Sequence, residues 1–209
     1  MSIIVKKNVK KYENIYLKGQ NHFYPNLDLV RIQKLFLKNF VGKTLDYGFG
    51  TGENLIFLSN EGHRVYGLET SPTALKIVKN KIKKIKADLK ILNNSKKLPY
   101  SDNFFDNIVC MSVLSQLKNR ENASNLLKEF SRVLKKGGNL IIDINGPKSS
   151  HFYNKKDFFS LSSKKAFLNF LEKYNFKVIS SGEVYTSYLK IKDHEYLAIL
   201  NKAWPVLIA

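Results

Sequence analysis

The hydrophobic residues of this chain follow two alternating patterns. Short apolar runs rich in β-branched residues are separated by longer stretches in which apolar residues recur every three or four positions. The first pattern is typical of strands and the second of helices that bury one face, so their alternation predicts a parallel sheet covered by helices. The predicted strands are Thr44–Asp46, Arg64–Glu69, Leu89–Leu92, Asn107–Met111 and Asn139–Ile144.

Helix signals connect these strands. Ser71 followed by Pro72 is a typical helix start, because serine caps the first turn and proline fits the first helical position. An apolar stripe at helical spacing follows, formed by Leu75, Val78, Ile82 and Ile85. Further helices are predicted over Asn122–Leu134 and Lys164–Tyr174. Two β-type stretches then predict a hairpin with a polar loop, formed by Lys177–Val184 and Glu195–Leu200.

A glycine-rich loop follows the first strand. Gly48, Gly50 and Gly52 alternate with other residues before a predicted helix. Glycines at these positions let a ligand approach the backbone, whose N–H groups can bind an anionic group. A dinucleotide site has the spacing G-x-G-x-x-G, but Glu53 stands here at the place of the third glycine and would repel a pyrophosphate. The loop therefore predicts a ligand other than NAD or FAD, and the alternative is a tight turn with a structural role alone.

Glu69 ends the second predicted strand. In a doubly wound fold, a carboxylate at this position can accept hydrogen bonds from both ribose hydroxyls of a nucleoside. Taken alone, Glu69 is equally well explained as an exposed acid at a strand end. Together with the glycine loop, it favours a nucleoside-binding site.

The chain is strongly basic, with 35 Lys and Arg against 17 Asp and Glu and a net charge of +18. The arginines are few, namely Arg31, Arg64, Arg120 and Arg132. Proteins that read nucleic acids favour arginine, whose planar guanidinium binds phosphate and guanine in a bidentate manner. We therefore interpret the lysines as a solvated surface, with a nucleic-acid face as the alternative.

The cellular context is expected to be reducing. The single cysteine, Cys110, lies in an apolar run and has no partner for an internal disulfide. No apolar stretch approaches the ~18 residues that a membrane helix needs. The N-terminus shows no signal-peptide pattern, so we expect a cytoplasmic protein that does not engage a membrane.

These motifs resemble those of the class I S-adenosylmethionine-dependent methyltransferases, in particular the group of small single-domain enzymes. The resemblance is carried, between Thr44 and Asn145, by the segments LDYGFGTG, YGLETSP, LPYSDNFFDNIVCMSVLSQL and EFSRVLKKGGNLIIDI. It implies S-adenosylmethionine as the cofactor. It also implies an α/β fold, a Rossmann-like doubly wound sheet of seven strands with helices on both faces and an antiparallel last strand.

The resemblance also implies cofactor contacts, residue by residue. Gly48, Gly50 and Gly52 would pass under the methionine and ribose parts of the cofactor. Asp46 would hold the amino group, and Glu69 would accept the ribose hydroxyls. The other implied contacts are Thr70 and Ser71 beside the adenine, Asn94 and Ser95 at the adenine amine, and Met111 and Ser112 around the sulfonium.

The chain departs from the family pattern at two places. The family usually has an aspartate at the position of Asn94, although an asparagine oxygen can accept the same hydrogen bond. Many relatives have a histidine pair after the fourth strand, where this chain has Leu114-Ser115, so no histidine base is expected there. No metal site is expected, because the four histidines are scattered along the sequence.

The acceptor side is expected to involve the N-terminal segment, which is rich in aromatic residues and amides. This segment predicts either a lid over the cofactor or a helix that packs by its aromatic side chains. We divide the single-domain chain into residues 1–40, which cap the active site, and residues 41–209, the methyltransferase domain. The candidate catalytic residues are His22, which titrates near neutrality and would act as base, and Tyr24.

The predicted reaction is methyl transfer to a small-molecule acceptor, at an oxygen of a sugar or another metabolite. One alternative is an RNA methyltransferase that uses the lysines between Lys76 and Lys97 as a phosphate track. The other is a protein that binds the cofactor without catalysis. The expected assembly is a monomer or a homodimer.

Overall fold

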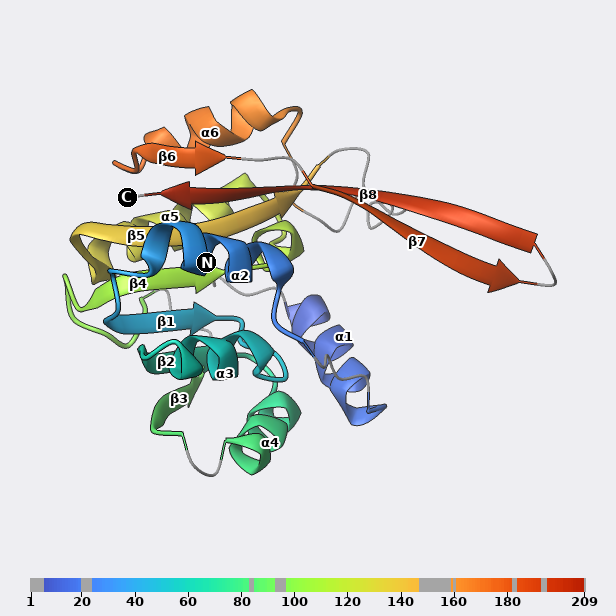
Figure 1. Ribbon diagram of the computed structural model, residues 1–209, viewed down its shortest axis with the longest axis horizontal. Helices are drawn as coiled ribbons and strands as arrows, with labels where there is room; N and C mark the ends of the chain where they lie inside the picture. The colour runs from blue at the N-terminus through green and yellow to red at the C-terminus, as the bar shows by residue number, and fades with distance from the viewer. Residues whose placement is uncertain are drawn as a thin grey trace.

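The computed structural model describes residues 6–19, 24–82, 85–92, 97–146, 159, 161–181, 184–192 and 195–208 (Figure 1). Its helices are α1 (Lys6–Leu17), α2 (Leu27–Ile32), the π-helical η1 (Gln33–Leu37), α3 (Glu53–Asn60), α4 (Pro72–Lys81), the 3-10 helix η2 (Leu114–Gln116), α5 (Arg120–Val133) and α6 (Lys164–Glu172). Its strands are β1 (Lys43–Tyr47), β2 (Arg64–Glu69), β3 (Ala87–Ile91), β4 (Phe105–Cys110), β5 (Leu134–Asn145), β6 (Val178–Ser181), β7 (Val184–Lys192) and β8 (Glu195–Ile208).

The strands form one sheet in the order β3-β2-β1-β4-β5-β8-β6, and β7 pairs with β8 outside this path. Strands β1 to β5 are all parallel to one another. Strand β8 pairs with β5 in the antiparallel sense, through Ala203 to Ile208. The remainder of β8 continues with β7 as a two-stranded arm that projects from the rest of the molecule (Figure 1).

The prediction of seven strands with an antiparallel last strand is wrong. The Rossmann-like part of the sheet has five strands, β1 to β5, all parallel. The chain after α6 then adds three strands where a two-stranded hairpin was expected, which brings the sheet to eight. The unexpected strand is β7, which lies where the lysines and hydroxyl groups of the sequence predict a polar loop. Its valine, tyrosines, threonine and isoleucine nevertheless favour a strand, and it pairs with β8 along its whole length, from Val184 to Lys192.

The elements of the parallel part agree closely with the apolar pattern. Strand β2 has the predicted bounds, and the helix expected after Ser71 is α4. The Ser71 side chain accepts a hydrogen bond from the Ala74 N–H, as expected of an N-cap. The apolar stripe of α4 is shorter than predicted, because the helix ends at Lys81, before Ile85.

Helices cover both faces of the sheet, which is the doubly wound arrangement. On one face, α5 and α6 bury side chains such as Phe130 and Phe170 against β4 and β5. On the other face, η1, α3 and α4 pack side chains such as Leu58 and Val78 against Val109 of β4. The parallel strands β1 to β5 lie between these two cores. Because these strands are parallel, their carboxyl ends lie at one edge of the sheet.

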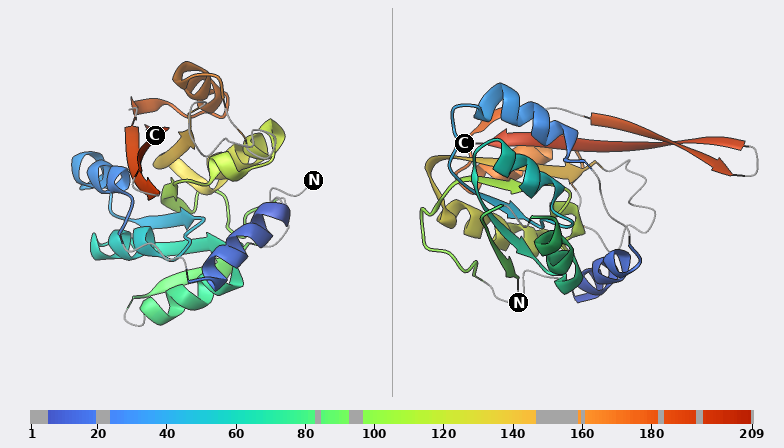
Figure 2. Two further views of the ribbon diagram at one scale, coloured as in Figure 1. Left: turned by 90° about the vertical axis from the view of Figure 1, so that its right-hand side faces the viewer. Right: turned by 60° about the horizontal axis from the view of Figure 1, so that its bottom comes forward.

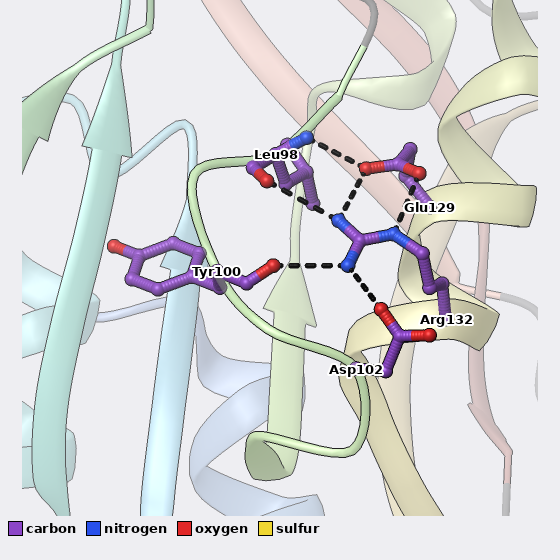
Figure 3. Close-up of polar contacts among 5 residues, drawn as sticks. All are labelled: Leu98, Tyr100, Asp102, Glu129 and Arg132. Carbon is purple, nitrogen blue, oxygen red and sulfur yellow. Dashed lines mark hydrogen bonds and ion pairs between the residues drawn. The ribbon is translucent and has the colours of Figure 1, made fainter.

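Arg132 of α5 fixes the loop between β3 and β4 (Figure 3). Its guanidinium donates to the Glu129 carboxylate at 2.7 Å and to the backbone carbonyls of Leu98 and Tyr100. Glu129 also accepts the Leu98 N–H at 2.6 Å, and Asp102 accepts from the guanidinium at 2.7 Å. A planar guanidinium with five donors is suited to bind several acceptors of one loop at once, so this cluster ties the loop to α5.

Candidate functional site

The predicted site residues of β1, β2 and β4 lie at the carboxyl edge of the parallel strands. Asp46 lies near the end of β1, Glu69 is the last residue of β2, and Met111 directly follows β4. Strands β2 and β4 are the two neighbours of β1, so the three strand ends are adjacent. Ligands of open α/β sheets bind at this edge.

The glycine loop has a backbone conformation that favours glycine. Gly48, Gly50 and Gly52 have φ angles of 79°, 52° and 90°. A Cβ atom at Gly52 would lie 2.8 Å from a methyl group of Val78, and one at Gly48 would overlap a methyl group of Val113. The loop is therefore packed closely between α4 and the turn after β4, and its glycines are required by geometry.

Glu69 connects the glycine loop to the start of α4. Its carboxylate accepts hydrogen bonds from the Gly50 N–H at 3.0 Å, the Thr70 N–H at 2.6 Å and the Ser71 N–H at 3.1 Å. The side chain of Glu69 is almost buried, with 7% exposure. The interpretation of Glu69 as an exposed acid at a strand end is therefore wrong, and the acid is part of the loop structure.

Asp46 carries a buried acceptor atom without a partner. The residue is 2% exposed, and its Oδ2 has no hydrogen-bond partner within the described part of the chain. Burial, together with the smaller effects of the nearby charges of Glu69 and Glu53, raises the pKa of Asp46 to about 8. A cationic donor at this position would satisfy the oxygen and stabilise the ionised carboxylate.

Helix α1 lies alongside α4 and reaches the glycine loop (Figure 2). The hydroxyl of Tyr16 would be 3.1 Å from a Cβ atom at Gly50, so the phenol lies over the loop. Burial, followed by the charge of Glu69, raises the pKa of Tyr12 to about 12 and also raises that of Tyr16. Both phenols therefore remain neutral donors near Glu69.

Glu13 attaches α1 to the start of α4. Its carboxylate accepts hydrogen bonds from the hydroxyls of Ser71 and Thr73. Desolvation raises the pKa of Glu13, but these hydrogen bonds outweigh it, so that the pKa lies below its usual value. The ionised carboxylate also lies at the amino end of α4, where the helix dipole favours negative charge.

The turn after β4 completes the described part of the site. Met111 is buried, whereas Ser112 is exposed and has a φ of 62°, which is unusual for a residue other than glycine. The Ser112 N–H donates to Oδ1 of Asp143 at 2.5 Å. The next residue, Val113, is the one that packs against Gly48.

Several predicted residues are not brought to the site by the described structure. His22, Asn94 and Ser95 lie outside the described residues. Tyr24 is described and is 81% exposed. Across the described residues, no group of three or more His, Cys, Asp or Glu side chains could hold a metal ion, and no helix has the length and apolar character needed to cross a membrane.

Two carboxylates of the site, Glu13 and Asp143, are missing from the sequence-based set. Each contacts a residue far away in the chain, with separations of 58 residues for Glu13 to Ser71 and 31 residues for Asp143 to Ser112. A weak signal for Asp143 exists, since it is an acid at the end of the otherwise apolar run Leu140–Ile142. A carboxylate in such a run needs a specific partner.

Comparison with known proteins finds similarity to methyltransferases. Residues 45–142 match a family described as a methyltransferase domain. The chain is 34% identical over 100 residues to demethylmenaquinone methyltransferase of Tropheryma whipplei (strain Twist), a match that covers 48% of this chain and 40% of the relative. The chain thus spans about two fifths of the length of that relative.

Two further similarities extend over most of the chain. An uncharacterized protein of Methanocaldococcus jannaschii is 31% identical over 195 residues, which are 90% of this chain and 81% of that protein. The crystal structure of an S-adenosylmethionine-dependent methyltransferase from Anabaena variabilis superimposes with a TM-score of 0.70 at 17% identity, covering 98% of this chain and 95% of the other.

Proposed function

Because this chain belongs to the class I S-adenosylmethionine-dependent methyltransferases, we propose that it transfers the methyl group of S-adenosylmethionine to a small-molecule acceptor. The observation that carries the proposal is the orphaned Oδ2 of Asp46, buried at the end of β1 immediately before the glycine loop. A buried carboxylate beside glycines that admit a ligand suits a cofactor that carries an ammonium group. S-adenosylmethionine has such a group in its methionine part.

The residues at the carboxyl edge fit the remainder of the cofactor. Gly48, Gly50 and Gly52 form the cradle, and a Cβ atom at Gly48 or Gly52 would clash with Val113 or Val78. Glu69 Oε2 accepts a bond from Gly50, and a carboxylate oxygen has capacity to accept a second one from a ribose hydroxyl. In this assignment Thr70 and Ser71 lie beside the adenine, and Met111 and Ser112 line the sulfonium region.

The cofactor supplies an activated methyl group on a sulfonium, and the protein supplies alignment and exclusion of water. Asp46 and Glu69 would fix the two ends of the cofactor on either side of the glycine loop. Tyr12 and Tyr16 would cover it from α1, with neutral phenols that can face a cation. We therefore assign residues 1–40 as the segment that caps the site, and residues 41–209 as the methyltransferase domain.

The acceptor is proposed as a small molecule without assignment of the methylated atom. Support comes from the relative named demethylmenaquinone methyltransferase, since the acceptor in that name is a small molecule. The expected oxygen acceptor receives no support from the described residues, since the candidate base His22 lies outside them and Tyr24 is 81% exposed.

The first test is ligand binding by the purified protein. We expect S-adenosylmethionine and S-adenosylhomocysteine to raise the melting temperature, and NAD to have no effect. A ligand at 100 times its Kd stabilises a folded protein by about 2.7 kcal/mol, which a thermal-shift measurement resolves easily. A larger shift with NAD, or no shift with either adenosyl compound, would contradict the proposal.

The second test is the variant Glu69→Gln. The amide keeps one acceptor oxygen and loses the charge, and hydrogen bonds to charged groups are worth about 1.5–3 kcal/mol. We expect S-adenosylmethionine to bind at least ~10-fold more weakly, as measured by titration calorimetry. The matched control is Glu61→Gln, which removes a surface carboxylate paired with Lys34 and should leave the affinity unchanged. Equal affinities for both variants would show that Glu69 does not contact the ribose.

A further inference from the structure

Asp143 is a nearly buried carboxylate that the assignment of the cofactor contacts does not use. It lies on β5 with 7% exposure, and its Oδ1 accepts the Ser112 N–H at 2.5 Å. Among the described residues, the titratable groups that have a charge interaction with it are Asp28 of α2 and Cys110 of β4. Neither is a cation, so the described contacts provide no ion pair to explain the burial of this acid.

The hydrogen bond of Asp143 holds a strained turn. Ser112 has a φ of 62°, a conformation that costs a residue with a Cβ atom about 1 kcal/mol or more. The bond from its N–H fixes this conformation, and the following residue, Val113, is thereby placed against Gly48. A chain of contacts thus runs from Asp143 through the turn to the glycine loop.

We propose that Asp143 is a positioning residue of the cofactor site, which holds the turn Met111–Val113 against the glycine loop. The inference rests on the proposed function, because it assigns this turn to the sulfonium end of the cofactor. Asp143 acts through the turn and does not touch the cofactor. Burial raises the pKa of Asp143, the bond from the Ser112 N–H opposes this increase, and the charge of Asp28 adds to it. The resulting pKa is about 7, so keeping this acid costs stability near neutral pH. Such a cost is common at functional sites.

The test compares two ligands that reach different parts of the site. Adenosine probes the ribose and adenine contacts, whereas S-adenosylmethionine also contacts the turn. We expect Asp143→Ala to weaken S-adenosylmethionine binding by ~10-fold or more in calorimetry, because the binding energy must then order a turn that has lost its internal hydrogen bond. Adenosine binding should stay within about two-fold. Asp143→Asn should restore most of the affinity, because its amide oxygen can accept the Ser112 N–H.

A second-site variant tests the route through the backbone. Glycine adopts positive φ without strain, so Ser112→Gly combined with Asp143→Ala should recover part of the affinity that Asp143→Ala alone loses. The matched control is Asp88→Ala, which removes an exposed acid paired with Lys90 and should behave as wild type. Circular dichroism verifies that each variant is folded.

The outcomes separate the two proposals. If the wild-type protein fails to bind S-adenosylmethionine, the proposed function is wrong. If it binds, but Asp143→Ala changes both ligands equally or neither, Asp143 has no positioning role. Failure of Asp143→Asn to restore binding, with the variant folded, would likewise overturn the inference.

Discussion

Replacing Asp46 by asparagine is expected to weaken S-adenosylmethionine binding at least ~10-fold while stabilising the ligand-free protein at neutral and alkaline pH. The two effects have one cause. The unpartnered Oδ2 favours a cationic ligand. Without that ligand, an ionised carboxylate at this buried position lowers the free energy of unfolding. Asparagine has nearly the same shape and cannot ionise. Calorimetry measures the first effect, and urea unfolding at several pH values measures the second.

The sign of the pH dependence follows from the raised pKa. In the folded protein the pKa of Asp46 is about 8, against an ordinary value of 3.8. The protonated group therefore contributes stability that is fully present below pH 3.8 and is lost as the pH rises through 8. The difference in unfolding free energy between Asp46→Asn and wild type should grow in favour of the variant across that window.

A control with the opposite sign is Asp106→Asn. Burial raises the pKa of Asp106, but hydrogen bonds from the Lys135 side chain and the Lys43 N–H lower it more, so the net shift is downward. This variant should be less stable than wild type at neutral pH, with the difference vanishing in strong acid. If Asp46→Asn behaves like Asp106→Asn, the carboxyl of Asp46 is ionised and paired in the ligand-free protein.

The second large effect is expected for Gly48→Ala. The φ of 79° costs an alanine about 1–2 kcal/mol, and overlap with Val113 adds about 1–3 kcal/mol, so the free energy of unfolding should fall by about 2–5 kcal/mol. Displacement of the turn should also weaken S-adenosylmethionine binding. Chemical denaturation and calorimetry measure the two losses.

Gly137→Ala is a matched control for this variant. Gly137 has a φ of 75°, but a Cβ atom there has no heavy atom within 4 Å. It should therefore show the backbone cost of about 1–2 kcal/mol and no loss of binding. Combining Gly48→Ala with Val113→Ala should recover part of the stability, as expected for residues in contact. Strict additivity of the two single variants would exclude the steric explanation.

Local signals in the sequence predict much of the parallel part of the fold. The Ser71 cap, the strand that ends at Glu69 and the alternating glycines each depend on residues within a few positions of one another. Steric and capping preferences act over the same short range. These features can therefore be predicted from the sequence without knowledge of any tertiary contact.

The missed features depend on contacts between distant segments. Nothing near Glu13 in the sequence indicates that its partner is Ser71, and Asp143 finds Ser112 only because β5 lies beside β4. The burial of Glu69 likewise comes from the folding of the glycine loop over it. Strand β7 was missed because the polar residues of this segment do not indicate a strand. Its backbone pairing with β8, which is a contact between segments, stabilises the strand.

The place of β8 in the sheet has a consequence for biosynthesis. Residues Ala203–Ile208 pair with both β5 and, in part, β6, so a strand that follows β5 at a long distance in the sequence fills an interior position of the sheet. Translation proceeds at about 5–20 residues per second, so several seconds separate the synthesis of β5 from that of its partner. During that time the open edge of β5 is a template for unwanted pairing with other chains. Unwanted pairing of this edge is therefore expected to be greatest in the interval before β8 is synthesised.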